Sequence, residues 1–205
     1  MPTTIPTDAL TTRAKVKSYA GISSTDFDTV IDELITYVTA YIKSYCGRQF
    51  KAASYIEIYD TYQGRKKLFL RQRPVNSITT VEYRSGTPTS PIWNTYSADS
   101  YLKYLEEGYI HFYGGLPGIS QGLRVTYNAG YLIDFTDEFN SAAHTLPEDI
   151  TLAATEICAV ILNKRKSQGI SSETTEGQSI TYETPKLSDH QRNILGKYKM
   201  LRIAR

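Results

Sequence analysis

Apolar residues recur at three- and four-residue steps between residues 25 and 46, which places them on one side of a helix. That side is predicted to consist of Phe27, Val30, Ile31, Leu34, Val38, Tyr41, Ile42 and Tyr45. Acidic residues, among them Asp32, crowd the first turns, where they would complement the helix dipole. Gly47 is expected to end this helix.

A shorter helix is predicted upstream, over residues 7–19. Thr7 or Asp8 can cap its first turn, and Gly21 can stop it. The N-terminal part of the chain is therefore expected to be helical.

Two more helices are predicted in the last third of the chain. Pro147 stands where a first helical residue would be, and a broad apolar face follows until Gly169 closes the segment. The second helix is predicted to be capped by Ser188 and to continue as an amphipathic helix towards the C-terminus, although Gly196 weakens it. A polar connector, residues 167–185, joins the two helices and contains the short strand-like sequence "SITYE".

The middle third has the period-two alternation of strands, as in "SYIEIYDTY" and "SITTVEYRSG". Turn residues separate these runs, and "EEG" between two aromatic runs predicts a hairpin turn. An antiparallel region of five or six strands is therefore expected between the helical segments.

Together these patterns predict an α+β fold, in which N- and C-terminal helices form a helical bundle core with an inserted antiparallel β region. The expected parts are residues 1–50 for the N-terminal helices, 51–135 for the β-rich insertion and 146–205 for the C-terminal helices.

Composition narrows the class of protein. The chain has 205 residues, 40% hydrophobic and 21% charged, which is ordinary for a folded domain, and its formal charge of +2 is too small to indicate nucleic-acid binding by bulk electrostatics. Its 17 tyrosines suit strands, half-buried surfaces and interfaces. Cys46 and Cys158 lack metal-site or disulfide-framework spacing, so two buried thiols are expected. The sequence shows neither a signal-peptide pattern nor a stretch long enough to span a bilayer. We therefore expect a cytoplasmic protein, or one that is assembled in a cytoplasm.

Candidate chemistry is sparse. His111, His144 and His190 have no metal-ligand spacing to another histidine, a cysteine or a carboxylate, and the chain contains no nucleophile elbow, P-loop or dinucleotide fingerprint. The acidic pairs at 106–107 and 137–138 lie beside turn residues, where solvated loop charges are expected. The residues therefore predict no catalytic, metal or cofactor site.

Two basic clusters have more than one interpretation. The first, in or near a predicted hairpin, is interpreted as a charged strand edge that prevents unwanted sheet pairing, with phosphate contact as the alternative. The second lies on the last helix, whose apolar side could pack on its own core or dock into an acidic partner groove. The first cluster consists of Arg65, Lys66, Lys67, Arg71 and Arg73.

The order of several segments resembles a known family. "LRVTYNAGY" at 123–131, "LPEDITLAATEICAVILNKRKSQGI" at 146–170, a polar run ending in "SITYE" and a last helix with "ILGKYKMLRIAR" are similar to the head-to-tail connector (adaptor) proteins of long-tailed bacteriophages and related gene transfer agents. At the N-terminus, "YAGI" and "YCGRQF" end two helices in the same way. The resemblance covers residues 8–50 and 123–205 well and the β region weakly.

This resemblance implies a structural virion protein without catalysis or a cofactor. Such adaptors form a ring, usually of twelve subunits, beneath the portal protein. The ring extends the channel through which DNA passes without sequence-specific binding, and it presents the surface for the next neck protein, a stopper or tail-completion protein. The implied location is the virion neck, after assembly in the host cytoplasm and with no membrane contact.

Two sets of contact residues are expected on this basis. The connector at 169–183 is expected to be loose in the isolated subunit and to become ordered in the ring, because its strand can add to the sheet of a neighbour. The end of the last helix is expected to contact the portal. The inter-subunit candidates are Gly169, Ile170, Gln178, Ile180 and Tyr182, and the portal-contact candidates are Arg192, Lys197, Tyr198, Lys199, Leu201, Arg202 and Arg205.

Other functions stay open at this point. The chain could be another neck or tail-completion protein of a virion. It could also be a nucleic-acid-binding module that uses the basic stretch at 65–73 and the tyrosines, and salt-dependent retention on DNA would favour that function. An enzyme whose site combines distant residues is a third class, which no motif supports.

Overall fold

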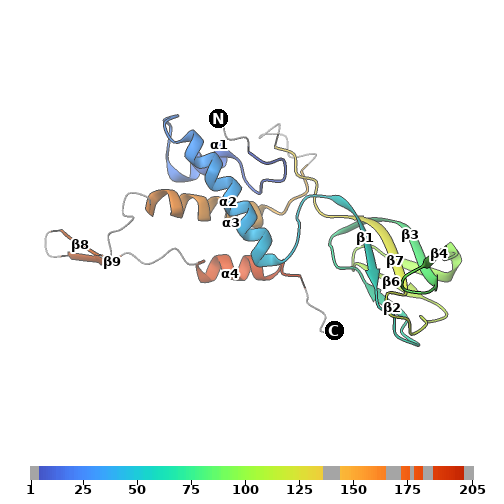
Figure 1. The fold of residues 1–205 in the computed structure, drawn as a ribbon. Helices are drawn as coiled ribbons and strands as arrows, with labels where there is room; N and C mark the ends of the chain where they lie inside the picture. Colours follow the sequence, from blue (N-terminus) through green and yellow to red (C-terminus); the bar gives the residue numbers. More distant parts are fainter. Residues whose placement is uncertain (1–4, 136–143, 165–171, 176–177, 182–186, 201–205) are drawn as a thin grey trace. The chain divides into compact units, whose positions relative to one another are not determined.

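The computed structural model describes residues 5–135, 144–164, 172–175, 178–181 and 187–200. The chain divides into two compact units (Figure 1). The helical unit comprises Met1–Arg48 and Ile133–Lys199, and the β unit is built on Gln49–Leu132. The predicted α+β class is confirmed, with antiparallel sheets inserted between N- and C-terminal helices.

In the described part of the helical unit there are four helices: α1 (Arg13–Ala20), α2 (Asp28–Cys46), α3 (Glu148–Lys164) and α4 (Asp189–Gly196). The glycines predicted to stop the first two helices do so, since Gly21 and Gly47 both adopt the left-handed conformation with φ of 67°. Ser188 caps α4 in a complete capping box, as its position predicted. The helices share a core that includes Leu10, Val16, Ile31, Ile35, Val38, Ile42, Ile150, Ala154, Cys158 and Leu195.

The predicted start of the first helix is wrong. α1 begins at Arg13 and is capped by Thr12, whose side chain accepts a hydrogen bond from the backbone of Lys15. The preceding residues stay out of the helix because tertiary hydrogen bonds hold them. The Leu10 amide donates to Thr39 Oγ1 at 3.3 Å, and the Thr11 hydroxyl lies 2.7 Å from that of Thr155.

The last helix is shorter than predicted. It ends at Gly196, after which the amides of Lys197, Tyr198 and Lys199 donate to carbonyls three residues back. Gly196 costs a helix backbone entropy, and three-residue hydrogen bonds are the usual way to tighten a final turn.

The β unit contains seven strands rather than five or six. They are β1 (Ala53–Tyr59), β2 (Lys67–Phe69), β3 (Val75–Gly86), β4 (Pro91–Thr95), β5 (Tyr101–Tyr104), β6 (Tyr109–Phe112) and β7 (Leu123–Ala129). One antiparallel sheet has the order β1-β7-β3-β4, and the other has the order β2-β6-β5. The predicted hairpin turn at "EEG" joins β5 to β6.

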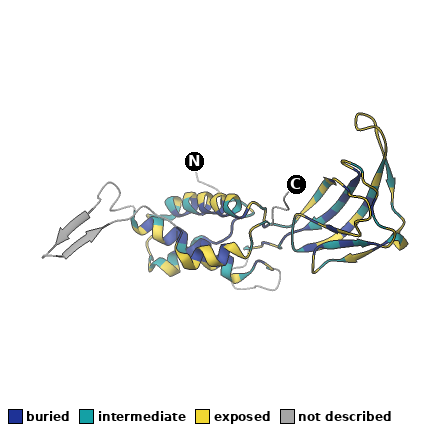
Figure 2. Ribbon diagram, turned by 90° about the horizontal axis from the view of Figure 1, so that it is seen from below, coloured by how far each residue is buried: buried dark blue, intermediate teal, exposed yellow. Residues whose placement is uncertain are grey.

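Both sheets contribute to one core in the β unit. Both buried and exposed residues occur in the strands of the β unit (Figure 2). They alternate most regularly along β7, where every second residue is buried. The inward residues include Leu68, Val81, Ile110, Phe112, Leu123, Val125 and Tyr127. Successive side chains of a strand point to opposite faces of its sheet, so the residues between the buried ones point outward. Those outward side chains are the ones that can contact a partner.

A third, two-stranded sheet belongs to the polar connector. β8 (Ser172–Thr175) pairs in antiparallel register with β9 (Gln178–Thr181). The strand predicted from "SITYE" is therefore present as β9, and its partner is the preceding segment of the same chain.

Candidate assembly surfaces

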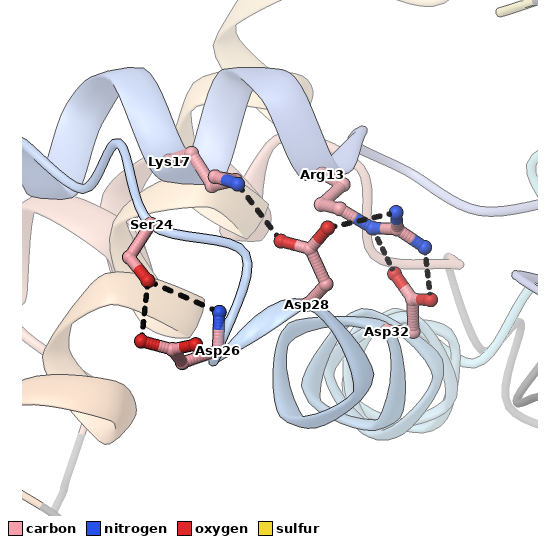
Figure 3. Close-up of polar contacts among 6 residues, drawn as sticks. All are labelled: Arg13, Lys17, Ser24, Asp26, Asp28 and Asp32. Atoms are coloured by element: carbon pink, nitrogen blue, oxygen red, sulfur yellow. Dashed lines mark hydrogen bonds and ion pairs between the residues drawn. The ribbon is translucent and has the colours of Figure 1, made fainter.

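An ion-pair cluster holds α1 against α2 (Figure 3). The Arg13 guanidinium donates to both carboxylate oxygens of Asp32, with an Nε–Oδ1 distance of 2.8 Å, and also to Asp28 at 3.2 Å. Lys17 Nζ donates to the other oxygen of Asp28 at 2.8 Å. Hydrogen bonding to Asp32 raises the pKa of Arg13, and the hydrogen bond from Lys17 lowers the pKa of Asp28.

This cluster corrects the expectation that Asp32 serves the helix dipole. Its side chain is only 4% exposed, and it pairs with Arg13 across two helices. The buried side of α2 is therefore only partly the predicted one, since Ile31, Val38 and Ile42 are buried as predicted and the rest of the side is turned. Ile35 and Thr39 are buried, while Tyr41 is exposed.

The portal-contact candidates that the structure describes lie against their own unit. The Tyr198 hydroxyl donates to Asp149 at 2.7 Å, and Lys197 lies 3.8 Å from the same carboxylate. Lys199 Nζ is 4.1 Å from the centroid of the Tyr45 ring. The apolar residues Leu187, Ile194 and Leu195 are buried in the unit's own core.

Arg192 donates to the Leu187 carbonyl at 3.0 Å and pairs with Asp189 at 3.4 Å. Together with Lys197 and Lys199 it is exposed, so these cations form a basic surface at and after α4. Leu201, Arg202 and Arg205 lie outside the described residues.

Two of the inter-subunit candidates fall on β9. Gln178 pairs with Thr175, and Ile180 pairs with Glu173. Within the described ranges this sheet has two strands, so each strand has one edge without a β partner. Gly169, Ile170 and Tyr182 lie outside the described residues.

The basic stretch of the β unit includes β2, an edge strand, as the charged-edge interpretation predicted. Sequence reasoning missed a further feature, which is that the cations lie over aromatic rings. Arg71 is 4.8 Å from the ring centroid of Tyr59, and Arg65 is 5.1 Å from that of Tyr62. These distances are within the range of cation–π attraction.

A partly buried polar cluster joins β1 to β7, and sequence reasoning also missed it. The carboxylate of Glu57 accepts hydrogen bonds from the hydroxyls of Tyr59 and Tyr127, the second at 2.9 Å. The Tyr127 oxygen accepts a hydrogen bond from the Gln72 amide at 3.1 Å. Burial raises the pKa of both phenols, so they remain hydrogen-bond donors. The sequence did contain a signal for this cluster, because Glu57 and Tyr59 are two residues apart on one predicted strand and therefore lie on the same face.

The cysteines and His144 lie in packed surroundings. Cys46 and Cys158 are free and buried, as predicted, and burial raises the pKa of their thiols to about 11 and about 12. His144 packs on the Phe135 ring at 4.6 Å, and burial lowers its pKa. The part of the chain that the structure describes contains no cluster of histidine, cysteine and carboxylate groups that could hold a metal ion. It also contains no helix long and apolar enough to cross a bilayer.

Comparison with known proteins identifies the family. The family model for head completion proteins matches residues 9–201 and therefore runs through both units. No curated protein matches the chain.

Three solved structures share the fold. The neck of an empty gene transfer agent particle, computed with six-fold symmetry, is 13% identical with a TM-score of 0.60, over 98% of this chain and 95% of that chain. A virion of a native gene transfer agent particle is 15% identical with a TM-score of 0.56, over 98% and 95%. The neck of a native particle, computed with twelve-fold symmetry, is 13% identical with a TM-score of 0.56, over 98% and 94%.

The matched range extends from before α1 to after α4, so it includes the positions of the β unit. This chain belongs to the head completion protein family, and it shares its fold with chains in the neck of gene transfer agent particles.

Proposed function

We propose that copies of this chain form a closed ring beneath the portal, and that the ring extends the DNA channel and provides the platform for the next neck protein. The family match over residues 9–201 carries this proposal. The six-fold and twelve-fold symmetries of the similar neck structures support a ring, with twelve subunits as the expected number. The chain acts without catalysis and without a cofactor.

The portal contact is assigned to the basic surface at and after α4. Arg192, Lys197 and Lys199 are exposed there while the apolar residues of α4 pack inward. Arg192 and Lys197 form ion pairs with Asp189 and Asp149, but exposed pairs of this kind contribute little free energy, so a partner's carboxylates can replace them. The sequence adds two more cations, Arg202 and Arg205, directly after this surface. An acidic surface on the portal would be the matching partner.

The β8–β9 hairpin is assigned to contacts within the ring or with the next neck protein. An unpaired strand edge can accept a strand from a second chain through main-chain hydrogen bonds. DNA passes through the lumen without sequence-specific binding, in keeping with a net charge of +2.

The first test measures the mass of the purified protein by light scattering, with negative-stain images, alone and mixed with a candidate portal protein. A ring, or a monomer that becomes a ring on the portal, is the expected result. A monomer that ignores the portal would contradict the proposal.

Two truncations test the portal contact. One removes residues 200–205 and keeps the contact of Lys199 with Tyr45, and the other also removes Lys199. Both are expected to abolish portal binding with an unchanged circular dichroism spectrum. If only the longer truncation has an effect, the portal contact is assigned to Lys199. If neither truncation weakens portal binding, the portal assignment is wrong.

A further inference from the structure

The two units carry opposite charge. The segments 1–48 and 133–199 contain twelve basic and fifteen acidic residues, while residues 49–132 contain nine basic and six acidic residues. A chain with one acidic and one basic part is suited to a head-to-tail contact, in which different surfaces of two copies meet.

One surface of the β unit concentrates the positive charge on aromatic rings. On the outward face of the sheet β2-β6-β5, Phe69 pairs with Tyr109, which pairs with Tyr104. The ring centroids are 5.4 Å apart in the first pair and 4.5 Å apart in the second. Lys67 Nζ lies 4.9 Å from the Tyr109 centroid, and the Arg73 guanidinium lies 5.7 Å from that of Phe69. We call these five residues the cationic aromatic face.

The charge of this face is not neutralised by its own unit. No acidic residue occurs between residues 61 and 81. Within the described ranges, the structure gives neither Lys67 nor Arg73 an ion pair with a carboxylate, and the same holds for Arg65, Lys66 and Arg71. Phe69 is nevertheless 42% exposed, so apolar area and uncompensated charge lie side by side.

The arrangement favours a protein partner over a nucleic acid. Stacking of bases needs open ring faces, whereas Tyr104 and Tyr109 stack on each other and Lys67 covers Tyr109. Exposed Phe, Tyr and Arg packed together are typical of the centre of a protein interface. The partner should therefore present a carboxylate beside aromatic rings.

α2 presents such a surface. Glu33, Tyr37 and Tyr41 are one turn apart on its exposed side, and the two rings stack with centroids 6.4 Å apart. Tyr37 is 60% exposed and Tyr41 is 38% exposed. The described residues provide no ion-pair partner for Glu33. This stripe extends about 12 Å along the helix, and three strands span about 10 Å, so the two surfaces are similar in size.

We propose that the cationic aromatic face of one copy binds the Glu33–Tyr37–Tyr41 stripe on α2 of the next copy, with Lys67 and Arg73 facing Glu33. The contact rests on the proposed ring. It makes the β unit the part that joins neighbouring subunits, and it explains why exposed rings in both units occur beside charges of opposite sign.

Charge reversal tests the contact in the full-length protein. The variants are Lys67→Glu, Glu33→Lys and the two combined, and ring formation is measured by light scattering, alone and on the portal. Each single reversal is expected to weaken association at low salt about tenfold, and the combination is expected to restore it. Lys66→Glu is the matched control, because it makes the same charge change at an exposed residue directly before β2 that is not part of the cationic aromatic face. Circular dichroism checks that every variant folds.

The outcomes separate this contact from the ring itself. A ring that tolerates both single reversals, or a combination that is weaker than either single variant, would overturn the contact and leave the ring standing. A protein that forms no ring in its unaltered form would overturn both. Salt-sensitive retention on DNA that is lost in Lys67→Glu, with normal ring formation, would show that the face binds DNA instead.

Discussion

The pairing of Arg13 with Asp32 leads to an asymmetric prediction about stability. The Asp32 carboxylate is 4% exposed, and the Arg13 side chain is 41% exposed. Replacing Arg13 with Met preserves the stem but leaves a buried carboxylate without its guanidinium. Replacing Asp32 with Leu leaves a cation that water and Asp28 can still satisfy. Arg13→Met should therefore lower the free energy of unfolding much more than Asp32→Leu does.

The size of the effect follows from the burial of the two groups. Removing one partner of a fully buried ion pair costs roughly 3–5 kcal/mol. Water can reach the space left by the half-exposed Arg13, so about 2–3 kcal/mol is expected for Arg13→Met. Asp32→Leu should cost about 1 kcal/mol, because a partly exposed pair contributes little by itself. The double variant should be close to Asp32→Leu, because no unpaired buried charge remains.

Urea unfolding followed by far-ultraviolet circular dichroism measures these differences. With an m-value of about 2 kcal/mol/M, Arg13→Met should lower the urea midpoint of the helical unit by about 1–1.5 M. Trp93 lies on β4 in the other unit, so its fluorescence serves as an internal control. Equal losses from Arg13→Met and Asp32→Leu, or a double variant less stable than Arg13→Met, would refute the reasoning.

Acid, thiol labelling and core truncation test other contacts. The hydrogen bond from Arg124 lowers the pKa of Glu82, so this pair stabilises the β unit at neutral pH and loses its effect as the pH falls below about 4.5. Glu82→Gln should therefore flatten the acid part of the curve of unfolding free energy against pH, which tryptophan fluorescence measures. An unchanged curve would count against the pair. Cys46 and Cys158 should react with a thiol reagent only after unfolding, and rapid labelling of the native protein would show that their burial is wrong. Leu195→Ala should destabilise the helical unit by about 3 kcal/mol in urea, and a loss below about 1 kcal/mol would mean that α4 is not part of its core.

Local signals predicted elements where a few neighbouring residues decide the outcome. Gly21 and Gly47 end their helices because the left-handed conformation is open to glycine. Ser188 begins α4 because its hydroxyl and the Gln191 side chain satisfy amides within the same turn. The hairpin at "EEG" depends on the same kind of short-range geometry.

Predictions failed where distant residues compete with local preference. Residues 7–12 have helical spacing, yet Leu10 and Thr11 bond to Thr39 and Thr155 and remain outside α1. The short strand β4 was not predicted, because it carries little pattern of its own and its pairing with β3 is what defines it. The candidate contact residues of the connector and the C-terminus came from the resemblance and stay predictions.

By itself the sequence determined the α+β class, the order of the elements and the family to which the chain belongs, because these depend on periodicity, caps and the succession of motifs. Only the tertiary structure decided which side of α2 is buried. A residue of another helix, Arg13, supplies the charge that draws Asp32 inward, and this leaves Glu33, Tyr37 and Tyr41 on the outside. The surfaces available for assembly follow from such long-range pairs, which no local pattern contains.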